Sequence, residues 1–188
     1  MPLSTLESIY SRYSCRAFSN KMPQNEDLQA IARAAVAAPS AMNRQPWQVI
    51  VLTNQELIGE LEAEGMKNLA ALPDKSIYER IQSRGGKLYY NAPSMMIITV
   101  KNTDDHAELL DCGIVTENIA LSATSLGIDT LICGLAAFSF SGEKGKLFKK
   151  RLGFWEGYDL GIAVLLGSAA CPGGTPHEPD ETKITWID

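Results

Sequence analysis

The chain has few of the residues that build metal sites and disulfide frameworks. Its 188 residues include only four cysteines and two histidines. The cysteines lie far apart and form no CxxC pair, so their spacing disfavours a Cys/His metal site and a small disulfide-stapled fold. We therefore expect no bound metal, and a reduced, cytoplasmic compartment.

Signals for export, membranes and nucleic acids are also missing. Residues Met1 to Tyr13 contain no apolar core of a secretory signal, and the apolar run from Ile162 to Leu166 is far too short to span a bilayer. The net charge of −5 disfavours generic nucleic-acid binding. The one basic cluster, Lys144 to Arg151, is expected to be a solvated helix face.

The common phosphate-binding and hydrolase motifs are absent. There is no GxGxxG, no GxxxxGK[ST] and no GxSxG. The Gly85 to Lys87 segment lacks the strand–loop–helix context of a phosphate loop. Neither histidine lies near a nucleophile in the sequence, so a hydrolase has no support.

Hydrophobic periodicity predicts helices on both sides of a sheet of buried strands. The segment His106–Leu126 is apolar nearly all round and is closed by Gly127. Such a helix is buried, and in a small domain a second chain is a plausible source of part of its cover. The expected helices are 6–12, 25–38, 55–65, 77–90 and 106–126, and the expected strands are 48–53, 94–100, 128–133, 160–167 and 183–188.

Two polar stretches carry the functional signal. In "SRYSCRAF", Ser11 to Phe18, the alternation of Arg12, Ser14 and Arg16 puts two guanidiniums and a hydroxyl on one edge of an extended segment. Arginine forks suit phosphate and carbonyl oxygens, although each arginine alone could be a surface residue paired with an acid. The second stretch, "APSAMNRQPW", carries far more hydrogen-bonding side chains than a plain helix-to-strand connection needs.

Together these stretches resemble the nitroreductase family of FMN-dependent oxidoreductases. That family carries Arg-x-Ser-x-Arg/Lys near the N-terminus and Pro-Ser-x-x-Asn-x-Gln-Pro-Trp after the next long helix, and both motifs are complete here. The "NAPSMMIIT", "AELLDCGIVTENIALSATSLGIDTLICG" and "LGFWEGYDLGIAVLLGSA" segments are similar to further parts of the family pattern. The resemblance therefore covers nearly the whole chain.

The resemblance implies a set of flavin-binding residues. Arg12 and Ser14, with Tyr13 between them, would meet the phosphate and ribityl end of FMN, and Arg16 would reach the pyrimidine edge of the ring. Lys183 would stand alone where the family often has a basic pair. Gln45 and Trp47 are expected to hold the turn and the core. Three further groups follow from the resemblance. The flavin bound mainly by the other subunit is expected against Pro39, Ser40, Ala41 and Asn43, and backbone groups near N5 are expected from Cys133, Gly134 and Leu135. Lys67 and Asn68 fall where some relatives contact the ring.

The fold that the resemblance implies is α+β, with a mixed, mainly antiparallel central sheet flanked by helices. It would be a single domain over residues 1–188, with residues 168–188 as an extended C-terminal arm whose strand is exchanged in a homodimer. The implied activity is hydride transfer from NAD(P)H through noncovalent FMN to a nitroaromatic, quinone or activated alkene, with no catalytic side chain. Another flavin reaction on the same fold, such as dehalogenation or flavin breakdown, and a non-enzymatic flavin-binding protein remain open.

Overall fold

The computed structural model describes residues 2–101, 106–171 and 173–187. Its centre is a four-stranded antiparallel sheet in the order β1-β2-β4-β3. The strands are β1 (Trp47–Leu52), β2 (Ser94–Lys101), β3 (Asp129–Cys133) and β4 (Tyr158–Gly167). The four strands are all antiparallel, which agrees with the mainly antiparallel sheet expected. An isolated parallel bridge between Ser14 and Thr130 adds the N-terminal segment beside β3.

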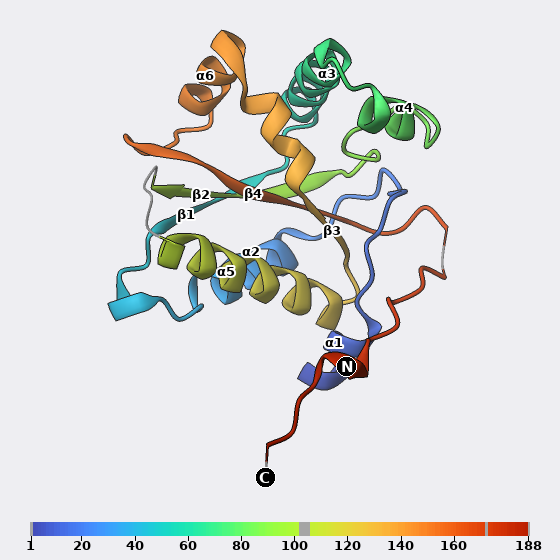
Figure 1. Cartoon of the computed structure of the whole chain (residues 1–188), viewed down its shortest axis with the longest axis vertical. Helices are drawn as coiled ribbons and strands as arrows, with labels where there is room; N and C mark the ends of the chain where they lie inside the picture. Colours follow the sequence, from blue (N-terminus) through green and yellow to red (C-terminus); the bar gives the residue numbers. More distant parts are fainter. Residues whose placement is uncertain (1, 102–105, 172, 188) are drawn as a thin grey trace.

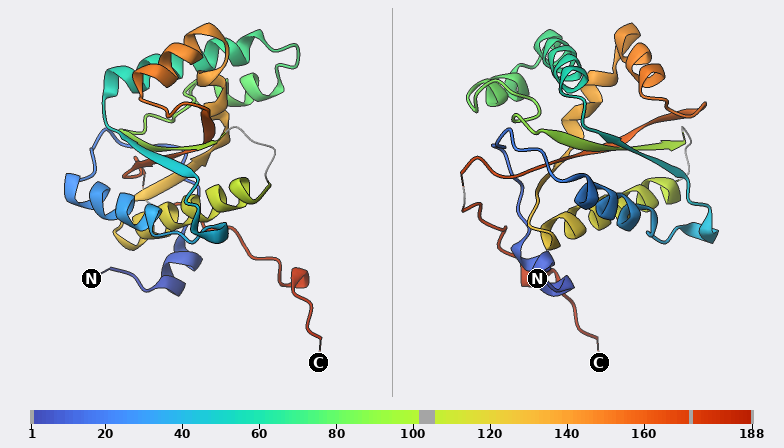
Figure 2. Two further views of the ribbon diagram at one scale, coloured as in Figure 1. Left: turned by 90° about the vertical axis from the view of Figure 1, so that its left-hand side faces the viewer. Right: turned by 180° about the vertical axis from the view of Figure 1, so that it is seen from behind.

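Helices cover both faces of the sheet, which gives three layers (Figure 1). One layer holds α3, α4 and α6, and the other holds α2 and α5, with α1 beside the end of α5 (Figure 2). The α-helices are α1 (Thr5–Ser11), α2 (Asn25–Val36), α3 (Gln55–Ala71), α4 (Ser76–Gln82), α5 (His106–Ser125) and α6 (Gly142–Arg151), and the short 3-10 helices are η1 (Ala41–Asn43), η2 (Gly134–Phe140) and η3 (Glu181–Lys183).

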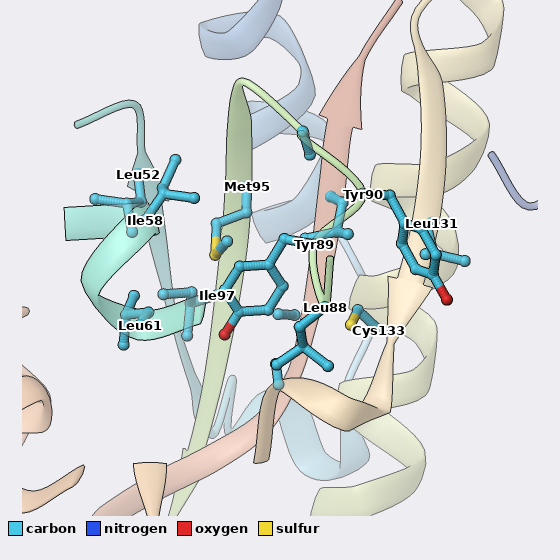
Figure 3. Close-up of a cluster of buried hydrophobic side chains, with 14 of the residues drawn as sticks. Leu52, Ile58, Leu61, Leu88, Tyr89, Tyr90, Met95, Ile97, Leu131 and Cys133 are labelled. Atoms are coloured by element: carbon cyan, nitrogen blue, oxygen red, sulfur yellow. The ribbon is translucent and has the colours of Figure 1, made fainter. Parts of the chain in front are cut away.

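The central strand β2 separates two apolar cores because its side chains alternate between the faces. Met95 and Ile97 join the core under α3 and η2, whereas Met96 and Ile98 join the core under α2 and α5. Figure 3 shows the first core and places the Tyr90 ring beside Leu131 of β3. Both faces of β2 are thus buried, as its sequence predicts.

Several expected elements differ from the structure, and the helix expected over 55–65 continues to Ala71. The strand near residues 48–53 is not buried on both faces, because β1 lies at the sheet edge and Val51 is 40% exposed. The helix expected over residues 77–90 ends at Gln82. Its end is a Schellman turn, in which the Gly86 N–H donates to the Ile81 carbonyl and Gly85 adopts a φ of +96°.

Helix α5 is less covered than its composition predicts. Val115, Ile119 and Ala123 are fully buried against the sheet and α2. Leu109 and Leu110, however, remain 60% and 71% exposed. In the sequence, Asp104 or Asp105 is the residue expected to open the helix that begins at His106, and both lie outside the described residues.

The C-terminal arm leaves the body of the structure after β4 (Figure 1). Residues 184–187, expected to be a strand, form no sheet pairing within the described chain. Trp186 and Ile187 are 84% and 93% exposed. Among the helices described, none has the length and apolar character needed to cross a membrane.

Candidate functional site

The N-terminal motif lies along the free edge of the sheet. Ser14 bridges to Thr130 of β3, and the Cys15 N–H donates to the Thr130 carbonyl at 2.9 Å. The Phe18 N–H donates to the Tyr90 carbonyl at 3.0 Å. These bonds fix an extended backbone, so Arg16 is held beside the end of β3.

Four of the sequence-predicted residues meet in one cavity of about 370 Å³. Arg16 comes from the N-terminal motif, and Cys133, Gly134 and Leu135 come from the junction of β3 with η2. The other lining residues are Arg80, Ile81, Arg84, Tyr90, Leu131 and Ile132. Among these described residues none is acidic, so three guanidiniums give the cavity a positive character.

The β3–η2 junction gives the cavity a smooth backbone wall. Cys133 is buried, and burial raises the pKa of its thiol to about 11, although the Leu135 and Ala136 N–H groups bond to the sulfur. The thiol is therefore neutral near pH 7. A Cβ built at Gly134 would meet no atom within 4 Å, so the backbone there is open to a close-lying ligand.

Sequence reasoning missed Tyr90, Arg80 and Arg84. Tyr90 and Asn91 both have positive φ, at 52° and 62°, a conformation that costs non-glycine residues free energy and is often found at functional sites. No sequence pattern announces that strain. The two arginines could have been found from the sequence, because they are four residues apart just before Gly85 and Gly86, which are typical of a helix end.

Arg12 and Tyr13 line a second, smaller cavity of about 100 Å³ at the start of β3. The Thr130 hydroxyl there is buried and lacks a hydrogen-bond partner within the described chain. Burial is the main reason that the pKa of Tyr13 is raised, and a hydrogen bond to Asp129 raises it further. Gly174 of the arm lies directly against the Tyr13 ring.

The second motif forms a strained turn around η1. Met42, Asn43 and Gln45 all have positive φ, between 48° and 55°. The Gln45 N–H donates to the Ser40 hydroxyl at 2.8 Å, and the Gln45 side chain donates to that of Asn43 at 3.2 Å. Trp47 is 4% exposed and packs in the core. Gln45 and Trp47 therefore hold the turn and the core, as expected.

The structure does not bring the two motifs together within one chain. The Ala41 N–H donates to both carboxylate oxygens of Asp111, at 3.2 and 3.3 Å, near the beginning of α5. Arg12 lies instead beside Thr124 at the other end of α5. At about 1.5 Å of rise per residue, these two points of the helix are about 20 Å apart (Figure 1). Ala41 and its neighbours in the turn thus lie far from Arg12 and the second cavity within their own chain.

Comparison with known proteins identifies the family. The nitroreductase family model matches residues 9–168. The chain belongs to the nitroreductase family. A crystal structure of a nitroreductase with bound FMN from Desulfitobacterium hafniense DCB-2 is 51% identical, with a TM-score of 0.95 over all of both chains. A nitroreductase with bound FMN from Bacteroides fragilis NCTC 9343 is 28% identical, with a TM-score of 0.88 over 99% of this chain and 100% of that one.

A curated relative of this nitroreductase-family chain comes from Archaeoglobus fulgidus. It is 31% identical over 162 residues, which cover 86% of this chain and 83% of the relative. That protein is provisionally named an NADH dehydrogenase/NAD(P)H nitroreductase. The family membership and the close structural likeness confirm the fold class that the sequence indicates.

The remaining expected contacts of this nitroreductase-family chain lie outside the two cavities. Lys183 is in η3 of the arm, 3.8 Å from Asp180 and largely exposed. Asn68 donates to the Phe138 carbonyl at 2.8 Å and so supports η2, while Lys67 pairs with Glu64 at 3.3 Å. In the described residues, no group of three or more His, Cys, Asp and Glu side chains could hold a metal ion.

Proposed function

We propose that this nitroreductase-family protein is an FMN-dependent oxidoreductase. It transfers hydride from NAD(P)H to a small organic oxidant, such as a nitroaromatic compound, a quinone or an activated alkene. The observation that carries the proposal is the meeting of Arg16 with Cys133, Gly134 and Leu135 in one positive cavity. The FMN bound by the 51% identical relative supports the choice of cofactor.

The residues present fit this flavin. The open space at Gly134 leaves room for a flat ring against the backbone, and Arg16 offers a guanidinium to the pyrimidine edge. Arg12, Tyr13 and Ser14 would hold the phosphate and ribityl end, beside the unpartnered Thr130 hydroxyl. When bound, FMN supplies reversible hydride transfer at N5.

The chain itself supplies binding and electrostatics. With FMN bound, the positive charge of Arg16 would stabilise negative charge on the pyrimidine side of the reduced flavin. Cys133 stays protonated near pH 7 and moves no proton. Neither His106 nor His177 lines the cavity. We infer that no side-chain acid or base is required, and that protons for the reduced product come from water.

The complete site needs a second copy of the chain. Pro39 to Asn43 lie about 20 Å along α5 from the Arg12 end, so they can meet a flavin only across a dimer interface. Leu109 and Leu110 of α5, with Trp186 and Ile187 of the arm, offer the exposed apolar surface for such an interface. A permanent homodimer of this kind usually buries more than roughly 2,000 Å² in total.

The proposal is tested on the purified protein reconstituted with FMN. We expect about one acid-releasable FMN per chain and steady NAD(P)H oxidation when a nitroarene is added. Flavin binding without turnover would favour a flavin-binding protein. Turnover of only halogenated aromatic compounds would favour a dehalogenase. Release of FAD, or no flavin binding at all, would overturn the proposal.

A further inference from the structure

The cavity has a charged wall that the proposed function leaves without a role. Cys133 to Leu135 and Arg16 are assigned to the flavin. Arg80 and Arg84 approach from α4 and from the turn that ends it. They are four residues apart along the last helical turn and its continuation, so they lie on the same side.

The geometry of this wall is fixed by the backbone. The Gly86 N–H donates to the Ile81 carbonyl at 3.0 Å, and the Gly85 N–H donates to the Gln82 carbonyl at 3.1 Å. These two bonds form the Schellman turn, which makes Arg84 the last residue of the helical turn. Ile81 is 1% exposed and anchors α4 in the core between the two arginines.

Both guanidiniums lack an acidic partner among the described residues, although the chain has more acids than bases. Within the described residues, neither Arg80 nor Arg84 makes a side-chain hydrogen bond or an ion pair. Other cations do find acids. Arg151, for example, donates to both oxygens of Glu60, at 2.8 and 2.7 Å. Two like charges at i and i+4 repel each other weakly, and an oxyanion between them would relieve that repulsion.

The neighbours of the pair indicate the shape of its ligand. Tyr90, Leu131 and Leu135 give the same cavity apolar surface. The flavin would take up part of this cavity of about 370 Å³, so the space left beside the arginines suits a compact reactant. A guanidinium fork is suited to a carboxylate or phosphate. The combination therefore suits a small molecule with an apolar body and one oxyanion.

We propose that Arg80 and Arg84 form an oxyanion-binding subsite beside the flavin, which selects a reactant that carries a carboxylate or phosphate. This inference rests on the proposed function, because it assumes that the flavin occupies the wall from Cys133 to Leu135. The oxyanion belongs either to the oxidant or to the dinucleotide donor. The chemistry of recognition is the same in both cases, and the experiment separates them.

The experiment compares the FMN-loaded wild type with Arg80→Gln, Arg84→Gln and the double variant. Arg33→Gln, at an exposed position of α2, is the matched control. The oxidants are 4-nitrobenzoate and its neutral analogue 4-nitrobenzamide. We expect each substitution to lower kcat/KM for the benzoate about tenfold through KM, the usual scale for a charge-assisted hydrogen bond. The kcat/KM for the amide and the FMN content should each change less than about twofold.

The donor arm uses the neutral amide and varies NADH and NADPH. A rise of about tenfold in donor KM, with the benzoate preference unchanged, would assign the subsite to the phosphate of the donor. Equal losses for benzoate and amide, or loss of FMN, would overturn the proposal, because the arginines would then serve the flavin. No change in any variant would overturn it as well.

Calorimetric titration of the FMN-loaded wild type with 4-nitrobenzoate separates this inference from the proposed function. Benzoate binding that is lost in the double variant, in a protein that oxidises no NAD(P)H, would retain the subsite and reject the oxidoreductase. Turnover of both oxidants, with no preference for the benzoate and no effect on the donor KM, would retain the oxidoreductase and reject the subsite. A thermal melt checks that each variant is folded, which we expect because both side chains are exposed.

Discussion

Replacing Gly134 by alanine separates flavin binding from folding. A Cβ at this position meets no atom within 4 Å, and its φ is not in the left-handed region. The protein without flavin should therefore melt as the wild type does, or slightly higher, since a compatible Gly→Ala change stabilises by about 0.4–1 kcal/mol. The new methyl group would, however, stand where the flavin ring is expected to lie against the backbone.

The expected loss of FMN affinity follows from overpacking. An added methyl group in a close contact costs about 1–3 kcal/mol, which weakens Kd about 5- to 150-fold. The assay is a fluorescence titration of FMN with the flavin-free protein, together with a thermal melt of the same sample. An unchanged FMN Kd in a folded Gly134→Ala protein would refute the assignment of this backbone to the flavin.

Gly145 supplies the matched control because its environment is the opposite. Gly145 lies in α6, away from the cavity, and a Cβ there would overlap the backbone carbonyl group of Phe140 at the end of η2. Gly145→Ala should therefore lower the free energy of unfolding by about 1–3 kcal/mol. Its folded fraction should bind FMN with the affinity of the wild type. If the two variants behave alike, the contrast drawn between the sites is wrong.

Three further predictions follow from single contacts. Asp111→Ala removes the acceptor of the Ala41 N–H, so it should lower the free energy of unfolding by about 1–3 kcal/mol and reduce the FMN occupancy. Asp111→Asn should retain most of the stability and most of the FMN, as measured by thermal melts and flavin assays. Arg16→Gln should make the bound flavin harder to reduce by about 1–3 kcal/mol, and a redox titration that gives an unchanged potential would contradict this. Burial raises the pKa of Cys133 from 9.0 to about 11, so the unfolded chain loses this proton first and stability falls between pH 9 and 11; the fall should be smaller in Cys133→Ala, as measured by denaturant titration.

Much of the fold was predictable because its signals are local. The apolar run of β2 and the amphipathic pattern of α2 indicate their burial directly. The early end of α4 was predictable in principle, since Gly85 and Gly86 are typical of a Schellman turn. The exposed edge of β1 was not, because strand order depends on pairings between distant parts of the chain.

The site was predictable only in pieces. The motif around Arg16 and the Gly134 junction were identified separately, and the fold brings them into one cavity. The sequence could not reveal that Asn43 lies at the far end of α5, because that distance depends on the packing of α2, η1 and α5. Tyr90 was missed because its left-handed backbone has no sequence signature.

The most direct test of the account is complementation between two defective chains. One carries Arg12→Ala and Arg16→Gln, and the other carries Ser40→Ala and Asn43→Gly. The glycine keeps the positive φ of 55° accessible at position 43. Each variant alone should bind FMN poorly as a homodimer.

Mixing the two chains by unfolding and refolding should restore tight FMN binding. Random pairing puts half of the dimers in the mixed form, and each mixed dimer has one intact site. The account therefore predicts tight FMN at about one quarter of all sites, co-sedimenting with the dimer. Recovery of no tight sites in a well-mixed dimer, or tight FMN on a monomer, would contradict a flavin site shared by two chains.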